Sequence, residues 1–596
     1  MATLDAKEER RALTDAVRPP AGYVLGACAA TAYSLDFDAF TAVLLAFVGA
    51  DYEEGVPDSP SVLTSIARLR SRVRVYVDAG GLHPPSSNRL FALYDGIIRR
   101  VSIKGTAFHP KVWALRFDPV SRPERHTAPA LFRVLCASRN VTDSTSWELG
   151  AVVNGQAGDH KQPFGMDVAA FIKRLAASRD FPKELWKLIE GLRTASFEIA
   201  REWADELRLE WQWPGPKPLK AKLPASASRA LVISPFIRAD FLDSIFKRVD
   251  DLIVVSAQEE LDALPDSAHQ QLAKAQTFVV REGEIDDTPT FELHAKLLAW
   301  ESGTQRETMI GSANATGPGW GVSGRANVEA MVSMRPGLRI DDVLKAFVSP
   351  TKGELHGWID RYQRLVVKPD EEEEAQRLLK STKRALCEQH ITARFDLKSA
   401  TLVLSIDGPS KVSPIPEHIA ATIMPLLSRD TNAWKDYADL HDDGAQFRRT
   451  ELEDVSAFAL VRLLDTNREG MELRFCVQCT LEMNEQQLEE RDGAVNARLL
   501  EGVDPRALLL NVLNGLPAGS GIVLRSDRHG KGQPGAGPLL RQATIERIME
   551  ACTADPGRML EIEAVLHACE GSAEMVQFQA FWKVFRLALN EVEAIG

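Results

Sequence analysis

The segment Leu293-His294-Ala295-Lys296-Leu297-Leu298-Ala299-Trp300 has a counterpart earlier in the chain, Phe108-His109-Pro110-Lys111-Val112-Trp113-Ala114-Leu115. Each copy is followed by a Ser-x-Asn triplet, and each triplet is followed by a glutamate. The triplets and glutamates are Ser138, Asn140 and Glu148 in the first copy and Ser312, Asn314 and Glu329 in the second. The copies are one domain length apart, which predicts two related halves and not a solenoid.

Both halves have an α/β pattern. Short apolar runs with strand character alternate with amphipathic helical patterns. In the first half the expected strands are 23–29, 73–77, 112–117 and 134–137, with a buried helix over 39–48. In the second half they are 230–234 and 252–256, with a helix over 240–248. The sequence therefore predicts an α/β fold in which two halves with mixed sheets are related by a pseudo-twofold axis.

At 596 residues and 45% hydrophobic, the chain is long enough for about four domain-sized units. We expect a first half over 1–155, a helical connector and linker over 156–225, and a second half over 226–368. The connector is expected to be mostly helical from Val168 to Arg208 and to end in the breaker-rich Pro214–Pro218. An acidic helical linker over 369–386 then leads into an α+β domain of unknown role over 387–596.

The C-terminal domain contains no copy of the repeat. Its expected strands are 401–406 and 472–480, and its expected helices are 543–552 and 578–589. A glycine-rich loop over 525–537 contains Gly530-Lys531-Gly532, which lacks the spacing of a P-loop, so no nucleotide triphosphatase is predicted.

Composition narrows the class of protein. Seven cysteines, an odd and sparse set, favour reduced thiols, and the N-terminus lacks the apolar core of a signal peptide. The longest apolar run, 39–50, is too short to span about 30 Å of hydrocarbon. A cytoplasmic protein that does not enter membranes is expected. The net charge of −12 argues against a chain that is basic throughout, but a local cationic site is compatible with it.

The repeated residues suit phosphodiester chemistry. Residues two apart on a strand share a face, so each half would present an imidazole, an ammonium and two neutral hydrogen-bonding groups. One histidine can attack phosphorus while the other protonates the leaving oxygen, because the two apical positions need separate groups. Lys111 and Lys296 would stabilise the equatorial oxygens, so no metal or other cofactor is predicted. Glu148 and Glu329 would accept from Nδ1 of the imidazoles.

Paired His-x-Lys with Gly-Ser-x-Asn resembles the signature of the phospholipase D superfamily over about residues 20–365. The second copy is close to that pattern, with Gly311-Ser312-Ala313-Asn314-Ala315-Thr316, Asn327 and Glu329, whereas the first has Ala137 in place of glycine. Arg116 and Glu301 stand where the family's aspartate is usual. That aspartate is frequently absent from the nucleases and DNA-repair enzymes of the superfamily, so the resemblance implies nucleic-acid chemistry rather than lipid chemistry. By the family's habit His109 is the nucleophile and His294 the proton donor, through a phosphohistidine.

The stretch 137–149 is also similar to phospholipase D-like nucleases encoded beside helicases in bacterial restriction and antiphage systems. This similarity implies a nucleic-acid substrate and a helicase, another ATPase or a further defence protein as partner. The chain would be a monomer or a homodimer.

Further residues are candidates for substrate binding. Arg99, Arg100 and Lys104 lie in a basic stretch that leads into the first histidine, and a solvated surface is the alternative. Trp320 and Arg325 lie in a glycine-rich loop and would stack on a base or line the groove, with a loop anchor as the alternative.

A zinc site and two functions other than a nuclease are the alternatives. Cys476-Val477-Gln478-Cys479 with Cys387 and His390 has zinc-ligand residue types, but strand alternation would send Cys476 and Cys479 to opposite faces, so structural thiols are favoured. A phospholipid hydrolase or phosphatidyltransferase is disfavoured because no amphipathic basic helix is evident. A catalytically silent nucleic-acid-binding or assembly module is the remaining alternative.

Overall fold

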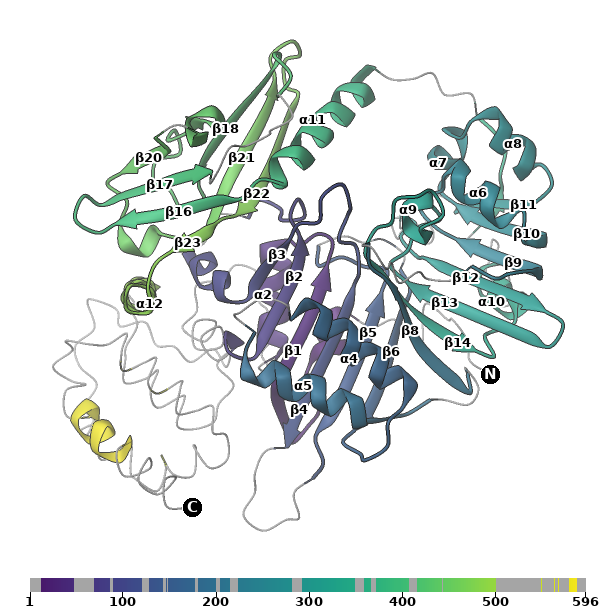
Figure 1. Cartoon of the computed structure of the whole chain (residues 1–596), viewed down its shortest axis with the longest axis horizontal. Helices are drawn as coiled ribbons and strands as arrows, with labels where there is room; N and C mark the ends of the chain where they lie inside the picture. The colour runs from purple at the N-terminus through teal and green to yellow at the C-terminus, as the bar shows by residue number, and fades with distance from the viewer. Residues whose placement is uncertain are drawn as a thin grey trace, which may run out of the picture.

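The computed structural model describes residues 12–47, 69–85, 89–119, 128–142, 146, 148–176, 181–199, 204–214, 223–280, 292–348, 359–365, 371–406, 415–441, 443–499, 548, 562, 566 and 578–586. The first half is built on a seven-stranded sheet of order β3-β2-β1-β4-β5-β6-β7 (Figure 1). Its strands are β1 (Tyr23–Ala32), β2 (Val73–Asp78), β3 (Ile98–Val101), β4 (Val112–Pro119), β5 (Leu131–Ala137), β6 (Gly150–Gln156) and β7 (Ser196–Phe197). The pairs β1–β2 and β2–β3 are parallel and the others antiparallel.

The second half repeats this sheet. Its order is β15-β11-β10-β9-β12-β13-β14-β8, and only β9, β10 and β11 pair in parallel. The strands are β8 (Glu206–Gln212), β9 (Ala227–Ile233), β10 (Val249–Ser256), β11 (Gln276–Val280), β12 (Leu297–Ser302), β13 (Gln305–Gly311), β14 (Glu329–Arg335) and β15 (Ile359–Arg361). Without the edge strand β15, the order matches the first sheet strand by strand, which confirms the predicted two-half α/β fold.

The expectation of a mostly helical segment from Val168 to Arg208 is only half right. Helices α4 (Pro163–Leu175) and α5 (Lys183–Thr194) form as expected, but residues 206–212 are the strand β8. There Leu207 and Leu209 point inward and alternate with more exposed polar residues, which is the period of a strand. β8 pairs with β14 in the place that β7 takes beside β6.

The two sheets share one hydrophobic core. Alternate residues of β4 point to opposite faces, so Val112 and Ala114 pack in this core with residues of the second sheet such as Ile233, Ala299 and Val332. Helices α4 and α5 add to the same core. The opposite face of the first sheet, with Trp113, is covered by α1 (Leu13–Val17), α2 (Phe37–Phe47) and the 3-10 helix η1 (Arg89–Gly96).

The outer face of the second sheet is covered by short helices. These are α6 (Ala239–Ile245), α7 (Gln258–Asp262), α8 (Asp266–Leu272) and α9 (Gly317–Trp320), and α10 (Ile340–Val348) follows β14. The inner faces of the two sheets therefore face each other across the shared core. This arrangement brings together the chain segments at the ends of the facing strands.

The C-terminal part begins with α11 (Glu371–Cys387), the helix expected after the acidic run. Two four-stranded sheets follow, β20-β17-β16-β23 and β19-β18-β21-β22, with a core between them that includes Ile391, Leu402, Val461 and Phe475. The strands are β16 (Ile391–Asp396), β17 (Thr401–Ile406), β18 (Ile419–Pro425), β19 (Lys435–Asp436), β20 (Ala445–Arg448), β21 (Phe458–Asp465), β22 (Glu472–Gln478) and β23 (Thr480–Glu482), with η2 (Tyr437–His441), η3 (Leu452–Asp454) and α12 (Glu485–Leu499).

Later C-terminal predictions fall largely outside the described residues. The glycine-rich loop 525–537 and all but one residue of the expected helix 543–552 lie there, whereas residues 578–586 are helical as expected.

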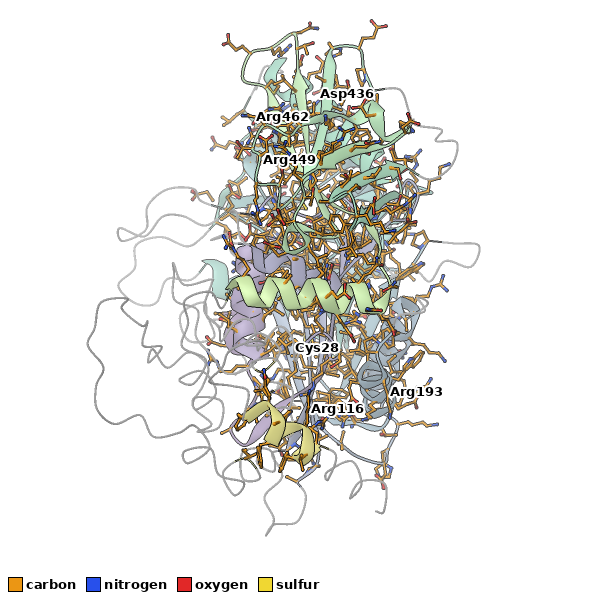
Figure 2. The ribbon with its side chains drawn as sticks, turned by 90° about the vertical axis from the view of Figure 1, so that its left-hand side faces the viewer. Cys28, Arg116, Arg193, Asp436, Arg449 and Arg462 are labelled. Atoms are coloured by element: carbon orange, nitrogen blue, oxygen red, sulfur yellow. The ribbon has the colours of Figure 1, made fainter. Side chains whose placement is uncertain are left out.

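This C-terminal part is bonded to the first half. The Cys476 N–H donates to the Leu82 carbonyl at 3.1 Å, and the Gln478 side chain donates to the Ile98 carbonyl at 2.9 Å. Figure 2 shows Asp436, Arg449 and Arg462 of the C-terminal sheets at the opposite end of the molecule from Arg116 and Arg193 of the first half. The C-terminal part therefore contacts the first half through the region of Cys476 and Gln478. Among the described residues, no helix is both long and apolar enough to cross a membrane.

Candidate active site

The two His-x-Lys triplets lie immediately before strands β4 and β12, in extended segments where the halves meet. The first segment is bonded across to the second half: the His109 N–H donates to the Val328 carbonyl at 2.9 Å, and the Val328 N–H donates to the Ala107 carbonyl at 2.9 Å. This short parallel bridge, Phe108 with Val328, sets His109 beside the start of β14. The nucleophile predicted from the first half is therefore positioned by the second.

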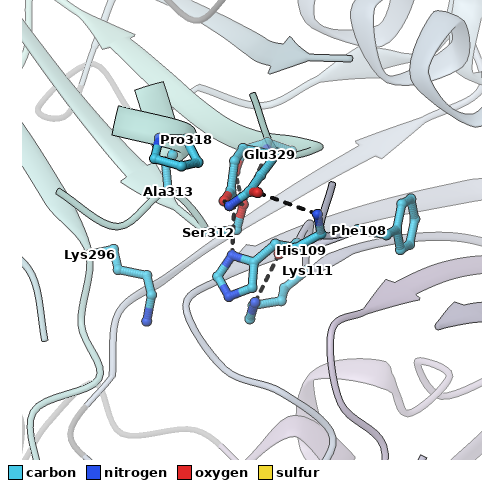
Figure 3. A network of polar contacts seen from close by, with 12 residues as sticks. Phe108, His109, Lys111, Lys296, Ser312, Ala313, Pro318 and Glu329 are labelled. Carbon is cyan, nitrogen blue, oxygen red and sulfur yellow. Dashed lines mark hydrogen bonds and ion pairs between the residues drawn. The ribbon is translucent and has the colours of Figure 1, made fainter. Parts of the chain in front are cut away.

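His109 is oriented by the glutamate of the opposite half. Its Nδ1 lies 2.9 Å from Oε2 of Glu329, which is buried at the start of β14 (Figure 3). Glu329 is itself fixed, because Ser312 Oγ donates to the same oxygen and Asn327 Nδ2 donates to Oε1 at 3.3 Å. A carboxylate in this position holds the proton on Nδ1, so Nε2 of His109 keeps a free electron pair.

His294 makes the reciprocal crossing. Its Nδ1 lies 3.6 Å from Oε1 of Glu148, and its ring is hydrogen-bonded to the backbone of Ser138, both in the first half. The same Nδ1 lies 3.2 Å from Lys296 Nζ. The contact with Glu148 is longer than a hydrogen bond, so His294 is held less tightly than His109. The two imidazoles are equivalent in sequence but not in their surroundings.

Lys111 and Lys296 take the same place in each half. Each Nζ donates to the carbonyl of the histidine two residues before it, at 2.8 and 2.7 Å. Both side chains are buried, and Figure 3 shows them on either side of the His109 imidazole. Burial lowers the pKa of Lys111 to about 7 and holds the pKa of Lys296 well below its usual range.

The other ionisable groups respond to the same burial. Loss of water lowers the pKa of His109, and the nearby lysine cations lower it further against the opposing effect of Glu329. Burial and the lysine cations also lower the pKa of His294. Burial raises the pKa of Glu148 to about 7. The two lysines and two histidines, four bases whose cationic forms are disfavoured in one place, make a site that a bound anion would complement.

The Ser-x-Asn residues close the site from both halves. Ser138 and Ser312 are buried, and their hydroxyls accept from the N–H groups of Leu149 and Ala330, each at 3.0 Å. Asn140 Oδ1 accepts from the Ser34 N–H at 3.4 Å. Asn314 Oδ1 is buried with no hydrogen-bond partner among the described residues, an acceptor left over beside the histidines.

The structure does not bring most of the predicted substrate-binding residues to this site. The Arg100 guanidinium donates to the Gln389 carbonyl at 2.8 Å, in the contact with the C-terminal part, and Arg99 donates to backbone carbonyls of η1 and β3. Trp320 is 3% exposed and packs against Phe241 in the core, so it has no free face for a base. Lys104 and Arg325 are exposed on loops and stay candidates.

Three residues of the site were not predicted from the sequence as site residues. Asn327 anchors Glu329, as described. Asp78, at the end of β2, accepts from the Phe108 N–H at 2.8 Å and so fixes the backbone before His109. Tyr33, just after β1, packs edge-on against the His109 ring with centroids 4.9 Å apart. For Tyr33 and Asp78 the available signal was position, because polar groups at the carboxyl ends of parallel strands gather at one edge of a sheet. For Asn327 the signal was its place in the family pattern two residues before Glu329.

The possible zinc ligands are arranged as structural thiols. Cys476 is buried in the core between the first half and the C-terminal part, whereas Cys479 is buried in the core of the C-terminal sheets. His390 contacts Thr480 Oγ at 3.0 Å. Within the described part of the chain, no three His, Cys, Asp or Glu side chains are grouped so as to hold a metal ion.

Comparisons with known proteins give a structural likeness only. No protein-family model matches the sequence, and no curated protein is similar to it. Among solved structures, yeast tyrosyl-DNA phosphodiesterase is similar with a TM-score of 0.37 and 12% identity, over 57% of this chain and 89% of that chain. A mutant of the same yeast enzyme gives a TM-score of 0.37 and 12% identity over 56% and 87% of the two chains.

Proposed function

We propose that the chain is a metal-independent phosphodiesterase that cleaves nucleic acid, DNA or RNA, at one composite site between the two halves. The observation that carries this proposal is the exchange of partners across the pseudo-twofold axis. His109 pairs with Glu329 and His294 faces Glu148, with a buried lysine beside each histidine. Two imidazoles that face glutamates of the opposite half, with a lysine beside each, suit a phosphoryl group.

The reaction has two balanced steps. In the first, Nε2 of His109 forms a bond to phosphorus, the bond from phosphorus to the leaving oxygen breaks, and protonated His294 gives that oxygen its proton. In the second, His294 takes a proton from water, the water oxygen attacks phosphorus, and the N–P bond breaks to restore His109. His109 takes the nucleophilic role because its Nδ1 is bonded to a buried carboxylate, which leaves Nε2 free.

The lysines supply the charge that a metal would otherwise provide. Burial lowers the pKa of both lysines, and the Lys111 cation lowers the pKa of Lys296 further. A phosphodiester anion restores the balance, so it raises both pKa values and also favours the protonated His294 that the first step needs. The Asn314 oxygen has no hydrogen-bond partner among the described residues and is available to a donor on the substrate.

The nucleic-acid class of substrate and the biological setting rest on the sequence resemblance to the phospholipase D superfamily. A helicase or other ATPase partner and a role in antiphage defence stay predictions of that resemblance, as does a cytoplasmic location.

Cleavage in the presence of EDTA is the direct test of the proposed function. We expect the purified protein to cut labelled single- or double-stranded DNA or RNA in chelator, because no step requires a metal ion. Product formation is followed on denaturing gels, with phospholipid vesicles as the alternative substrate. Strict dependence on magnesium, or cleavage of lipid alone, would overturn the proposal.

The pH dependence of kcat/KM is expected to differ from that of an enzyme whose essential lysine has an unperturbed pKa. Lys111 has a pKa of about 7 in the free protein, so its cationic form is present below this pH and is lost above it. We therefore expect kcat/KM to fall as pH rises through about 7, whereas an unperturbed lysine would stay protonated up to about 10.4.

A pH profile of kcat beside that of kcat/KM checks this expectation. Bound phosphate raises the lysine pKa, so the alkaline limb of kcat should lie at higher pH than that of kcat/KM. The Glu148→Gln variant removes the carboxyl that titrates in the same range; the alkaline limb should persist but move to lower pH, because the Glu148 carboxylate raises the pKa of Lys111. Coincident limbs in the ordinary lysine range would contradict the role of Lys111.

A further inference from the structure

The end of helix α11 lies beside the candidate active site. A Cβ atom placed on Gly80 would be 3.7 Å from both Lys383 Cε and Cys387 Sγ, so the last two turns of α11 pack on the Gly80–Gly81 turn. A Cβ placed on Gly81 would be 1.8 Å from the Tyr33 carbonyl oxygen, so this turn packs directly on Tyr33. The first helix of the C-terminal part is therefore one layer of residues away from the ring that contacts His109.

Tyr33 is placed between the histidine and solvent. Its ring meets the His109 ring at 62°, and Lys111 Nζ lies 5.7 Å from its centroid. It is nevertheless 38% exposed, which is unusual for a large aromatic residue in contact with a buried histidine. The Tyr33 ring therefore borders the site while the residue keeps more than a third of its surface accessible.

Two exposed basic residues lie in the second half of α11. Lys380 and Arg384 are four residues apart, so they lie on one face of the helix, about 6 Å apart along its axis. We call these two residues the α11 basic stripe. Figure 1 shows α11 above the first sheet, between the C-terminal sheets and the second half. Burial raises the pKa of Tyr33 and of Asp78, and Arg384, at the end of the stripe nearest the Gly80–Gly81 turn, is close enough to both groups to oppose that rise.

Acidic residues lie at both ends of the α11 basic stripe. Glu374 precedes it and Glu388 follows it, and Glu388 Oε1 already accepts from the Gly105 N–H at 3.1 Å. Both oxygens of Asp78 face inward, where they accept from the N–H groups of Phe108 and Gly80. Lys383 lies between the Gly80–Gly81 turn and the C-terminal sheets, with its ammonium 5.3 Å from the Phe475 ring centroid.

We propose that Tyr33 and the α11 basic stripe form a binding track for the single-stranded nucleic acid that flanks the scissile phosphate. A base stacks on the exposed face of Tyr33, and the following phosphates pair with Arg384 and Lys380. An unpaired strand is required because only an unpaired base presents its face to a tyrosine. This inference rests on the proposed function for the class of substrate and assigns to the C-terminal part a share of substrate binding.

Binding of a short fluorescein-labelled single-stranded DNA to the full chain tests the track. Fluorescence anisotropy is measured in EDTA over a series of salt concentrations, with the His109→Asn substitution in every protein so that the DNA stays intact. Arg384→Gln and Lys380→Gln should each weaken binding and reduce the slope of log K against log salt by about 0.7, the value for one phosphate contact to a single strand. Tyr33→Ala should weaken binding about tenfold, and Tyr33→Trp should restore it.

The controls separate this inference from the proposed function. Lys398→Gln removes an exposed lysine at the β16–β17 turn and should leave both affinity and salt slope unchanged. Unchanged slopes in Arg384→Gln and Lys380→Gln, with folding verified by circular dichroism, would overturn the track even if the native chain cleaves DNA. Conversely, a native chain that binds DNA through these residues but cuts no nucleic acid would overturn the proposed function and leave the track standing.

Discussion

Replacement of His109 by asparagine is expected to lower kcat for nucleic-acid cleavage by about 10⁴-fold or more, the range found when a nucleophile is removed from a catalytic set that acts as a unit. Asparagine has no ring nitrogen that can attack phosphorus, whereas its amide can still donate to Glu329. The backbone of this segment is held independently by the bond from the His109 N–H to Val328 and by the bond from Phe108 to Asp78. The loss should therefore appear in turnover with the fold intact.

His160→Asn is the matched control. His160 is also followed by a lysine, in His160-Lys161, but its side chain is 91% exposed and pairs only with its neighbour Asp159. We expect its kcat and its melting temperature to equal those of the native chain. Retention of most activity in His109→Asn would show that the nucleophile lies elsewhere.

The repeated sequence pattern predicted the fold. The order His-x-Lys, Ser-x-Asn, Glu in each half named ten candidate site residues, and the strand order of the two sheets confirmed the duplication. The strand β8 was not predicted because it follows two amphipathic helices and supplies an edge of the second sheet from the connector. Its alternation is short, and pairing with β14, not local propensity, makes it a strand.

The exchange of glutamates could not be predicted from the order of residues. Glu148 follows His109 in the chain, and nothing local indicates that His109 pairs with Glu329 instead. That pairing follows from the bridge between Phe108 and Val328, which joins two segments that are distant in the chain. The residues that the bridge brings together, His109 and Glu329, are 220 positions apart. Of the two roles left open for Trp320, the structure favours the loop anchor, because the helix α9 turns its ring into the core against Phe241.

Replacement of His294 is expected to trap a covalent intermediate, and the effect depends on the leaving group. With an ordinary nucleotide as leaving group, His294→Asn should lower kcat by about 10²- to 10⁴-fold, because no acid protonates the departing oxygen. With a p-nitrophenyl ester of a nucleotide, the leaving phenolate needs no proton, so the first step should continue. The second step still lacks the group that takes a proton from water, so the nucleotidyl group should stay on Nε2 of His109.

Mass spectrometry of the intact protein measures this intermediate directly. His294→Asn mixed with the p-nitrophenyl ester should release about one equivalent of p-nitrophenol in a burst and gain the mass of one nucleotidyl group, in the manner of other covalent catalysts. The bond should be lost in acid and survive in alkali, as expected of phosphorus bound to an imidazole nitrogen. The double variant His109→Asn with His294→Asn should show neither burst nor adduct.

The two histidines differ in how closely each contacts its glutamate, and this difference predicts which variant accumulates the covalent intermediate. His109 Nδ1 lies 2.9 Å from its glutamate and His294 Nδ1 lies 3.6 Å from Glu148, so His294 is the group with freedom to exchange protons with a leaving oxygen and then with water. If the roles were reversed, His109→Asn would accumulate the adduct on His294 and His294→Asn would show no burst. An adduct in the first variant and none in the second would therefore reverse the assignment while leaving the composite site intact.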